Sequence, residues 1–242
     1  MSTSSIRSDL APTGKLRVGI NYGNPVLAKR DPVTGDLRGV AVDLGRELGR
    51  RVGVQVELVG YESAGQMVEG LKSGAWDVAF LAVDPGRATE ISFTAPYIEI
   101  EGTYLVLAGS PFQDVADVDR KGVRIGVSDK SAYDLFLRRN IQHAELVHAA
   151  DPNAAFDLIL AGKVDVVAGV RQHLVANAAK LPGSRVLESR FMAIGQAVGV
   201  PKGRDEAARY TCEFVEDVKA SGFVAEAIAR AGIRDVAVAC GS

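Results

Sequence analysis

The chain has 242 residues, 47% hydrophobic and 24% charged, and is long enough to bury a sizeable core as one large domain or two small ones. A formal net charge of −2, with scattered basic residues, gives no reason to expect nucleic acid or an anionic membrane as a partner. Two cysteines are too few for a disulfide framework or a cysteine metal site. Residues 1–12 contain no apolar core of an export signal, which indicates either a cytoplasmic protein or a signal that has been removed.

Predicted strands and helices alternate in the first half of the chain. Val40, Leu44 and Leu48 recur at helical spacing before the stop signal Gly53, and Ser63 is the expected cap of a second helix. The strands are apolar throughout, as expected for a parallel sheet covered on both faces. The predicted strands are 15–20, 54–59, 78–83 and 103–107, and the predicted helices are 40–52 and the segment from Ser63 to Gly74.

The second half repeats this order. Residues 121–127 (KGVRIGV) repeat the pattern of KLRVGI, and LAGKVDVV matches LKSGAWDVAF as a helix end, a glycine, an aspartate and an apolar strand. This loose duplication predicts two α/β units of one design. The predicted strands are 121–127, 145–148, 163–169, 186–187 and 193–200, and the predicted helices begin at Ser131, Pro152, Gln172, Asp205 and Phe223.

Arg87 stands at a distinctive place in this pattern. It follows the apolar run 78–83 and the turn Asp84-Pro85-Gly86, so it is expected at the carboxyl edge of a parallel sheet, where open α/β folds bind ligands. Its fork of donors suits a carboxylate or phosphate. The alternative is a surface ion pair with Glu90, and these residues alone leave the two interpretations even.

In their order and spacing, the motifs resemble the family 3 solute-binding proteins, the polar amino-acid receptors of bacterial ABC importers. The resemblance rests on KLRVGI, LKSGAWDVAFLA, an arginine followed by ISFTAPY, GVRIGV, LAGKVDVVAG and GVPKG, and covers the chain from Gly14 to Gly232. It implies an α/β, two-lobed type II periplasmic-binding-protein fold, each lobe a mainly parallel sheet flanked by helices, joined by two hinge crossovers near 103–109 and 191–195. The expected lobes are residues 14–106 plus 194–242 and the inserted residues 107–193, with 1–13 as a polar amino-terminal arm.

The resemblance also implies a function. A small carboxylate-bearing metabolite would be captured in a cleft between the lobes by hinge closure, for an ABC permease and in the periplasm. We expect a monomer with no cofactor, no metal and no chemistry of its own.

Ten residues are expected to bind the ligand, led by Arg87, which falls on the arginine that clamps the α-carboxylate in relatives. Ser131 opens a helix whose amides and positive dipole end can share an anionic group, although a plain helix cap is an equal alternative. Besides Asp84 and Arg171, which are discussed next, the other expected pocket residues are Asn21, Tyr22, Tyr61, Phe80, Ala132 and Tyr133.

Three positions bear on what the ligand is. Relatives place an aspartate for the ligand's ammonium where this chain has Val170, which favours an organic anion or a modified amino acid over a standard one. Asp84 is a candidate replacement, and capping of a turn is the alternative for it. Arg171 is a candidate second anion clamp that would indicate a dicarboxylate or phosphorylated ligand, unless it extends into water.

An enzyme and a cytoplasmic ligand sensor are the alternative functions. No GxSxG, HExxH, Walker A or GxGxxG motif is found, and His143, His148 and His173 do not cluster in the sequence and are expected at the surface or an edge. Cyclohexadienyl dehydratases share the fold, and Glu99 or Glu101 would be the general acid of such a lyase, with exposure near the hinge as the alternative. The missing export signal favours a sensor, and the missing output domain disfavours it.

Overall fold

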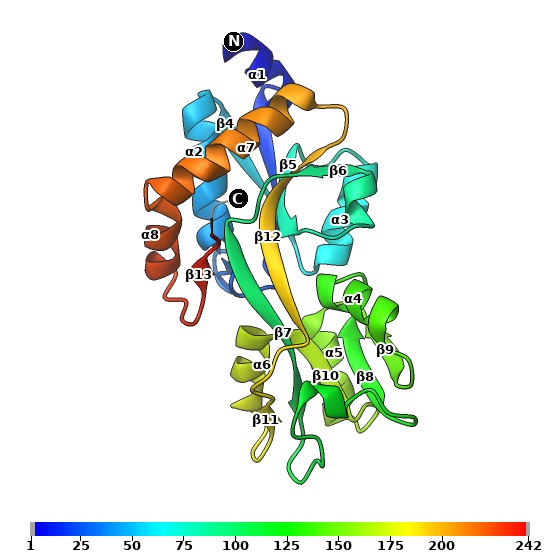
Figure 1. Ribbon diagram of the computed structural model, residues 1–242. Helices are drawn as coiled ribbons and strands as arrows, with labels where there is room; N and C mark the ends of the chain where they lie inside the picture. The colour runs from blue at the N-terminus through cyan, green and yellow to red at the C-terminus, as the bar shows by residue number, and fades with distance from the viewer. Residues whose placement is uncertain (1–2, 241–242) are drawn as a thin grey trace. The chain divides into compact units, whose positions relative to one another are not determined.

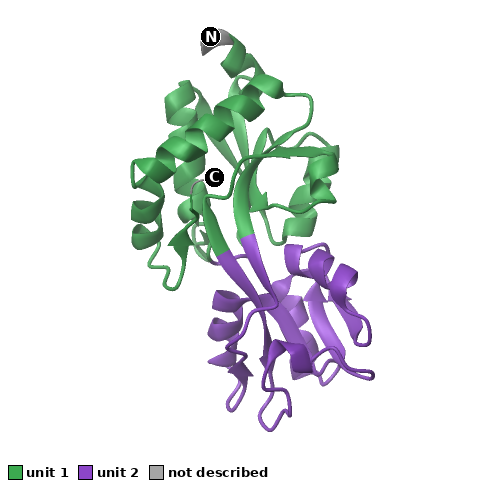
Figure 2. Ribbon diagram, viewed as in Figure 1, with its two compact units in different colours: residues 1–22, 26–99, 195–242 green, residues 23–25, 100–194 purple. Residues whose placement is uncertain are grey.

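The computed structural model describes residues 3–240, which divide into two compact units (Figure 2). Unit 1 contains the described residues up to Tyr22, residues 26–99 and the described residues from Gly195 onward, and unit 2 contains residues 23–25 and 100–194. Strands and helices alternate along both units, which confirms the predicted α/β class (Figure 1). None of the described helices combines the length and apolar character that crossing a membrane requires.

Apart from the short segment 23–25, the chain passes between the units inside two long strands, β7 (Ile98–Val106) and β12 (Met192–Pro201). Unit 1 ends at Glu99 within β7, earlier than the expected lobe end at residue 106, and resumes at Gly195, next to the expected residue 194. The boundary after Glu99 differs from the predicted one because β7 is one uninterrupted strand. Its apolar pattern therefore contains no break that would place the division.

The sheet of unit 1 has the strand order β4-β1-β5-β12. Strands β4, β1 and β5 are parallel, and β12 and β6 extend the sheet in antiparallel pairs. The strands are β1 (Lys15–Asn21), β4 (Gln55–Tyr61), β5 (Val78–Ala82), β6 (Ile91–Phe93) and β13 (Ala237–Val238), with a hairpin of β2 (Lys29–Arg30) and β3 (Leu37–Arg38). The helices are α1 (Thr3–Leu10), α2 (Val40–Val52), α3 (Ala64–Lys72), the 3-10 helix η1 (Arg87–Thr89), α7 (Asp205–Ala220) and α8 (Phe223–Arg230).

Side chains alternate between the two faces of the unit 1 sheet. Val18 and Phe80 point toward α2, which approaches so closely at Gly45 that a Cβ atom there would lie 2.9 Å from Val18. Gly19 faces the other side, where its own Cβ position would lie 3.3 Å from Trp76. Both faces are thus covered, which explains why all five residues of β5 are buried and why the strands are apolar throughout.

The sheet of unit 2 has the order β7-β10-β8-β9, with β8 parallel to β10 and β9, and β10 antiparallel to β7. Leu105, Phe156 and Leu174 belong to a core cluster between this sheet and the helices α5 and α6. The remaining strands are β8 (Arg124–Ser128), β9 (Glu145–Ala149), β10 (Val166–Val170) and β11 (Arg185–Val186). The helices are the 3-10 helix η2 (Val115–Asp117), α4 (Ala132–Asn140), α5 (Pro152–Leu160) and α6 (Arg171–Ala178).

Each unit contains an arginine–aspartate ion pair, and the two pairs have the same geometry. Asp77 accepts from the backbone N–H, Nε and Nη2 of Arg17 at 3.0, 2.9 and 2.7 Å. Asp165 accepts from the same three groups of Arg124 at 2.8, 3.1 and 2.9 Å. In both units the aspartate N–H also donates to the arginine carbonyl oxygen. This common arrangement supports the duplication predicted from the sequence motifs.

The amino terminus is not the polar arm that we expected for residues 1–13, of which residues 1–2 lie outside the described part. Thr3–Leu10 form α1, which packs on α7, and Leu10 is fully buried. Arg7 Nε donates to the Val52 carbonyl oxygen at 2.7 Å, and Asp9 Oδ2 accepts from the Ala207 N–H at the start of α7 at 2.9 Å. The segment therefore belongs to unit 1, which its polar composition concealed.

Tyr97 offers a test of the unit 1 core. Its side chain is 0% exposed, its ring meets Phe80 edge-on at 5.8 Å, and its hydroxyl has no hydrogen-bond partner among the described residues. A buried polar group left unpaired costs about 1–3 kcal/mol. We expect Tyr97→Phe to raise the free energy of unfolding by about 1 kcal/mol, measured by urea denaturation.

The matched control is Tyr210→Phe, because Tyr210 is partly exposed and its hydroxyl can bond to water. That variant should change stability by less than about 0.5 kcal/mol. A loss of stability in Tyr97→Phe would show that the Tyr97 hydroxyl has a polar partner such as a buried water.

Candidate functional site

The turn after β5 is closed by Asp84. Its Oδ1 accepts from the N–H groups of Gly86 at 2.8 Å and Arg87 at 3.3 Å, and the residue is 3% exposed. The side chain thus does what the alternative interpretation expected, because it caps the turn that leads into η1. A role for Asp84 as the acid for a ligand ammonium stays a prediction.

Arg87 is buried at the carboxyl edge of β5. It is 5% exposed, and Nη1 donates to the carbonyl oxygen of Ala82 at 3.0 Å. Burial lowers the pKa of the guanidinium to about 10, against the attraction of Asp84, which acts in the opposite direction. Glu90 is exposed, so the alternative of a surface ion pair does not fit the burial of Arg87.

The loop after β1 places Asn21 and Tyr22 differently. Asn21 ends β1 beside Tyr61 and is 8% exposed. Tyr22 is partly exposed, lies 5.5 Å beneath the Arg30 guanidinium and bonds through its hydroxyl to Glu62 at 3.3 Å. Its ring lines a cavity of about 340 Å³ beside the β2-β3 hairpin.

Two residues expected to wall the pocket contact helices of unit 1. Phe80 is 0% exposed and packs between Tyr97 and helix α2, so the prediction that it walls the pocket is wrong. Tyr61 directs its hydroxyl at α3, where a Cβ on Gly70 would lie 2.5 Å from the Tyr61 oxygen. Tyr61 is partly exposed, so its role as a wall residue stays a prediction. An aromatic residue in a strand can face a covering helix, as Phe80 does, as well as a ligand.

In unit 2, Ser131 caps α4. Its Oγ accepts from the Asp134 N–H at 3.1 Å, and Ala132 and Tyr133 follow as the first two helical residues. All three predicted residues are buried, and burial raises the pKa of the Tyr133 phenol to about 12. The cap is thus present as the alternative interpretation expected, and the helix still presents its first amides at the end of β8.

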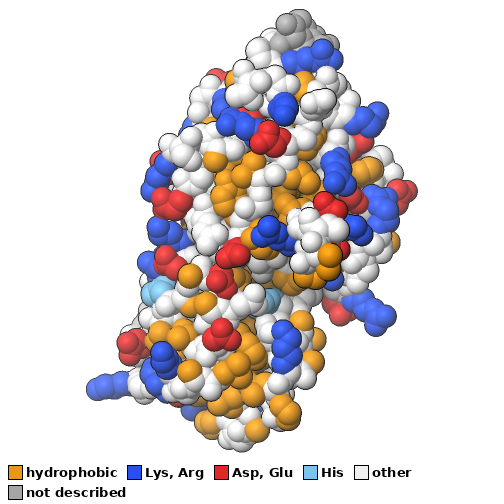
Figure 3. Space-filling view, turned by 180° about the vertical axis from the view of Figure 1, so that it is seen from behind, with side chains coloured by type: hydrophobic (Ala, Val, Ile, Leu, Met, Phe, Trp, Pro, Cys, Tyr) orange, Lys and Arg blue, Asp and Glu red, His pale blue; other side chains and the backbone are white. Residues whose placement is uncertain are grey.

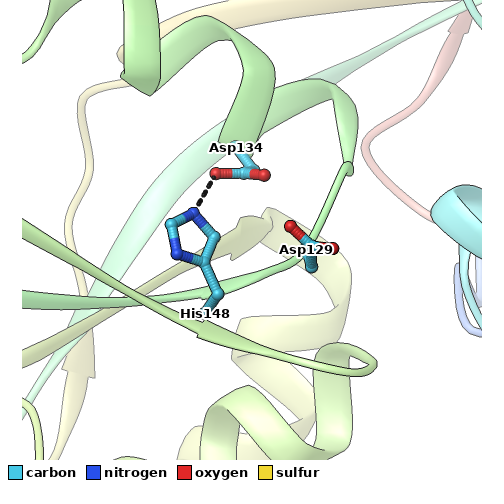
Figure 4. A group of neighbouring side chains, drawn as sticks. All are labelled: Asp129, Asp134 and His148. Atoms are coloured by element: carbon cyan, nitrogen blue, oxygen red, sulfur yellow. Dashed lines mark hydrogen bonds and ion pairs between the residues drawn. The ribbon is translucent and has the colours of Figure 1, made fainter.

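A cluster behind this helix start was missed by the sequence analysis. His148 Nε2 lies 2.9 Å from Asp134 Oδ1, and Asp129 is close by (Figure 4). The oxygen and nitrogen atoms of these three side chains lie within 4.8 Å of one another, as metal ligands would. The guanidinium of Arg138 already contacts both carboxylates, with Nη2 at 2.7 Å from Asp129 and 2.8 Å from Asp134. The signal in the sequence was the capping pattern Ser131-x-x-Asp134.

Arg171 is held within unit 2 and does not extend into water. Nε donates to Glu101 at 2.6 Å, Nη1 to the Leu187 carbonyl at 3.0 Å and Nη2 to the Glu188 carbonyl at 2.8 Å. Glu101 also pairs with Arg190 at 3.4 Å. These contacts occupy most of the donors of Arg171, so we no longer offer it as a second anion clamp.

The surroundings of Val170 are apolar. Val170 and Gly102 are cross-strand partners, so both face the same side of the unit 2 sheet. The ring of Phe191 covers Gly102, where a Cβ atom would lie 2.9 Å from it. Phe191 also meets Tyr104 and Phe136 at centroid distances of 4.7 and 6.0 Å. Val170 therefore shares its face of the sheet with a cluster of aromatic rings.

Comparison with known sequences gives a family match over most of the chain. A model described as "Bacterial extracellular solute-binding proteins, family 3" matches residues 16–231. The virulence sensor protein BvgS of Bordetella pertussis is 27% identical over 130 residues, 53% of this chain and 10% of that protein, so the match spans about a tenth of its length. The glutamine-binding protein of Geobacillus stearothermophilus is 23% identical over 194 residues, 78% of this chain and 73% of that protein.

Solved structures establish the fold. A mutant of ArgBP from T. maritima matches with a TM-score of 0.79 and 21% identity, covering 93% of this chain and 98% of that one. The ancestral amino acid-binding protein AncCDT-1, titled a precursor of cyclohexadienyl dehydratase, matches with a TM-score of 0.78 and 18% identity, covering 92% and 97%. The expected type II periplasmic-binding-protein fold is confirmed. Figure 3 shows one face of the molecule, on which charged side chains of both signs are interspersed with apolar ones.

Proposed function

The chain belongs to family 3 of the bacterial extracellular solute-binding proteins, and from this premise we propose that it captures a small carboxylate-bearing solute for an ABC importer. The solute is an amino acid, a modified amino acid or an organic acid. Its capture between two closing lobes is the part of the proposal that rests on the family alone.

The observation that carries the proposal is the burial of Arg87 at the carboxyl edge of β5. A guanidinium at 5% exposure has lost most of its hydration, and its lowered pKa records that loss. A carboxylate can replace the lost water with two parallel charge-assisted hydrogen bonds. The relatives named for glutamine and arginine support the same chemistry, because both of those amino acids carry an α-carboxylate.

Native mass spectrometry of the purified protein, followed by a thermal-shift panel of amino acids, dicarboxylates and aromatic acids, tests this proposal. We expect at least one carboxylate to raise the melting temperature in a concentration-dependent way. The absence of any shift across the panel, with no mass adduct, would contradict it.

The ligand preference at Val170 gives a second prediction. Val170→Asp adds a carboxylate where the wild-type chain is apolar, and should strengthen binding of an amino acid about 10- to 100-fold over the same acid without its amino group. Wild-type protein should show no such preference. Calorimetric titration of matched ligand pairs measures both.

Val170→Asn is the control for this prediction, because it matches aspartate in shape and lacks its charge. It should leave the ratio between the two ligands near the wild-type value. A wild-type protein that already prefers the amino-bearing ligand tenfold would contradict the interpretation of Val170.

A lyase is the second candidate, favoured by the likeness to AncCDT-1. Its expected general acids are poorly placed, because Glu101 is engaged by Arg171 and Arg190 and Glu99 is exposed. Turnover of prephenate or arogenate would move the protein to the enzyme class. The match to BvgS favours a third candidate, ligand sensing, which a neighbouring permease gene would argue against.

A further inference from the structure

Lys130 has a backbone conformation that a residue with a Cβ atom rarely adopts. Its φ is 56°, and among the described non-glycine residues only Asp235 shares a positive φ. Lys130 directly precedes Ser131, the cap of α4, so this conformation sets the path by which β8 reaches the helix. An unfavourable conformation persists only where surrounding contacts enforce it.

The enforcing contact comes from Asp134. The Lys130 N–H donates to Asp134 Oδ2 at 2.8 Å, and the Asp134 side chain is 0% exposed. Arg138 Nε and Nη2 approach the same carboxylate at 3.0 and 2.8 Å, and His148 approaches from β9 (Figure 4). The carboxylate therefore cannot turn away from Lys130 without breaking its contacts with Arg138 and His148.

A cationic side chain lies against the Asp134 carboxylate. Arg138 makes a two-pronged contact with the carboxylate and reaches Asp129 as well, so one guanidinium lies between two carboxylates. A carboxylate paired with a guanidinium repels an anion near the first amides of α4 less than an unpaired one would. Lys130, Arg138 and His148 all belong to unit 2, so these contacts of Asp134 form within one unit.

We propose that Asp134 is a positioning residue for ligand binding. By holding the Lys130 N–H, it keeps residues 128–131 in the path that presents the first amides of α4 to the anionic group of the solute. The proposal rests on the proposed function and on the expectation from the sequence that those amides share the anionic group with Arg87. Asp134 acts through the loop and does not touch the solute, because protein donors occupy its carboxylate.

Four variants test the proposal: Asp134→Asn, Lys130→Gly, the double variant and Asp151→Ala. Glycine adopts a positive φ without strain, so the loop of the Lys130→Gly variant depends less on Asp134. Asp151 caps α5 through the N–H groups of Asn153 and Ala154, so its replacement destabilises a helix of the same unit away from the loop. It therefore controls for simple loss of stability.

Calorimetric titration is made with a carboxylate that stabilises the wild-type protein. We expect Asp134→Asn to weaken binding at least tenfold. The affinities of Lys130→Gly and Asp151→Ala should stay within threefold of the wild-type affinity. The double variant should recover most of the affinity that Asp134→Asn loses. Amide hydrogen exchange without ligand should show faster exchange at Ser131, Ala132 and Tyr133 in Asp134→Asn, and protection restored in the double variant.

The outcomes separate the two proposals. Wild-type affinity in Asp134→Asn, with binding still lost in Arg87→Ala, would overturn the positioning role and leave the proposed function standing. If no carboxylate binds the wild-type protein, the proposed function fails. In that case the exchange measurement still tests the positioning role, which is overturned if Asp134→Asn exchanges at Ser131, Ala132 and Tyr133 as slowly as wild type. Where Asp134→Asn does not fold, a folded double variant that binds supports the proposal, and an unfolded double variant contradicts it.

Discussion

Replacing Arg87 with alanine should weaken ligand binding about 100- to 10,000-fold, because two charge-assisted hydrogen bonds contribute roughly 1.5–3 kcal/mol each. The side chain is 5% exposed, so a carboxylate bound there has little water to take the place of the guanidinium. Calorimetric titration with a carboxylate that stabilises the wild type measures the loss. Circular dichroism confirms that the variant is folded.

Two further variants define what Arg87 contributes. Arg87→Lys keeps the positive charge and loses the fork of donors, so its affinity should fall between wild type and Arg87→Ala. Arg46→Ala removes an exposed arginine from α2 of the same unit and should bind as wild type does. Full affinity in Arg87→Ala would show that the clamp assignment is wrong.

The pH dependence of binding follows from the lowered pKa of Arg87. Burial lowers that pKa to about 10, so the free protein carries the positive charge below this pH and loses it above. A bound carboxylate favours the charged form. Affinity should therefore hold at neutral pH and fall as the pH rises through about 10.

The second large effect is expected at Asp77. Asp77→Asn should lower the free energy of unfolding by about 3 kcal/mol or more, because the side chain is 0% exposed and forms ion pairs with both Arg17 and Arg204. Asp165→Asn is a control that the duplicated fold itself provides. Asp165 makes the same contacts with Arg124 at 39% exposure, so its replacement should cost less than about 1 kcal/mol.

Urea denaturation of both variants measures the difference. Equal losses would contradict the view that burial decides the strength of the pair. The pH dependence of stability provides an independent check. Burial raises the pKa of Asp77, but the hydrogen bonds from Arg17 and Arg204 lower it by more, so the pKa lies below its usual value of 3.8. This stabilisation is present above about pH 4 and is lost as the pH falls through the lowered pKa, so Asp77→Asn should flatten the acid limb of the stability profile.

The fold was predictable because its signals are local and periodic. The helix at Val40–Val52 shows its apolar stripe and its glycine stop in one short segment, and the caps Ser63 and Ser131 lie where their patterns placed them. Helix α1 was missed for the opposite reason. Its burial depends on contacts such as Asp9 with Ala207, which are far apart in the sequence.

The candidate site was predictable only in part. The place of Arg87 follows from the strand and turn before it, but whether Phe80 faces a ligand or α2 depends on the face that a helix covers. Arg171 was misjudged because its partner, Glu101, lies 70 residues away in the sequence. The cluster around Asp134 joins β9 to α4, and no local pattern connects His148 to that helix.

The most direct test of the central claim is calorimetric titration of wild-type protein and Arg87→Ala side by side, after unfolding and refolding to remove any ligand carried through purification. We predict that at least one small carboxylate binds the wild type with one-to-one stoichiometry and binds Arg87→Ala at least about 100-fold more weakly. Equal affinity of the two proteins for that carboxylate would contradict the assignment of Arg87 as the group that holds the ligand.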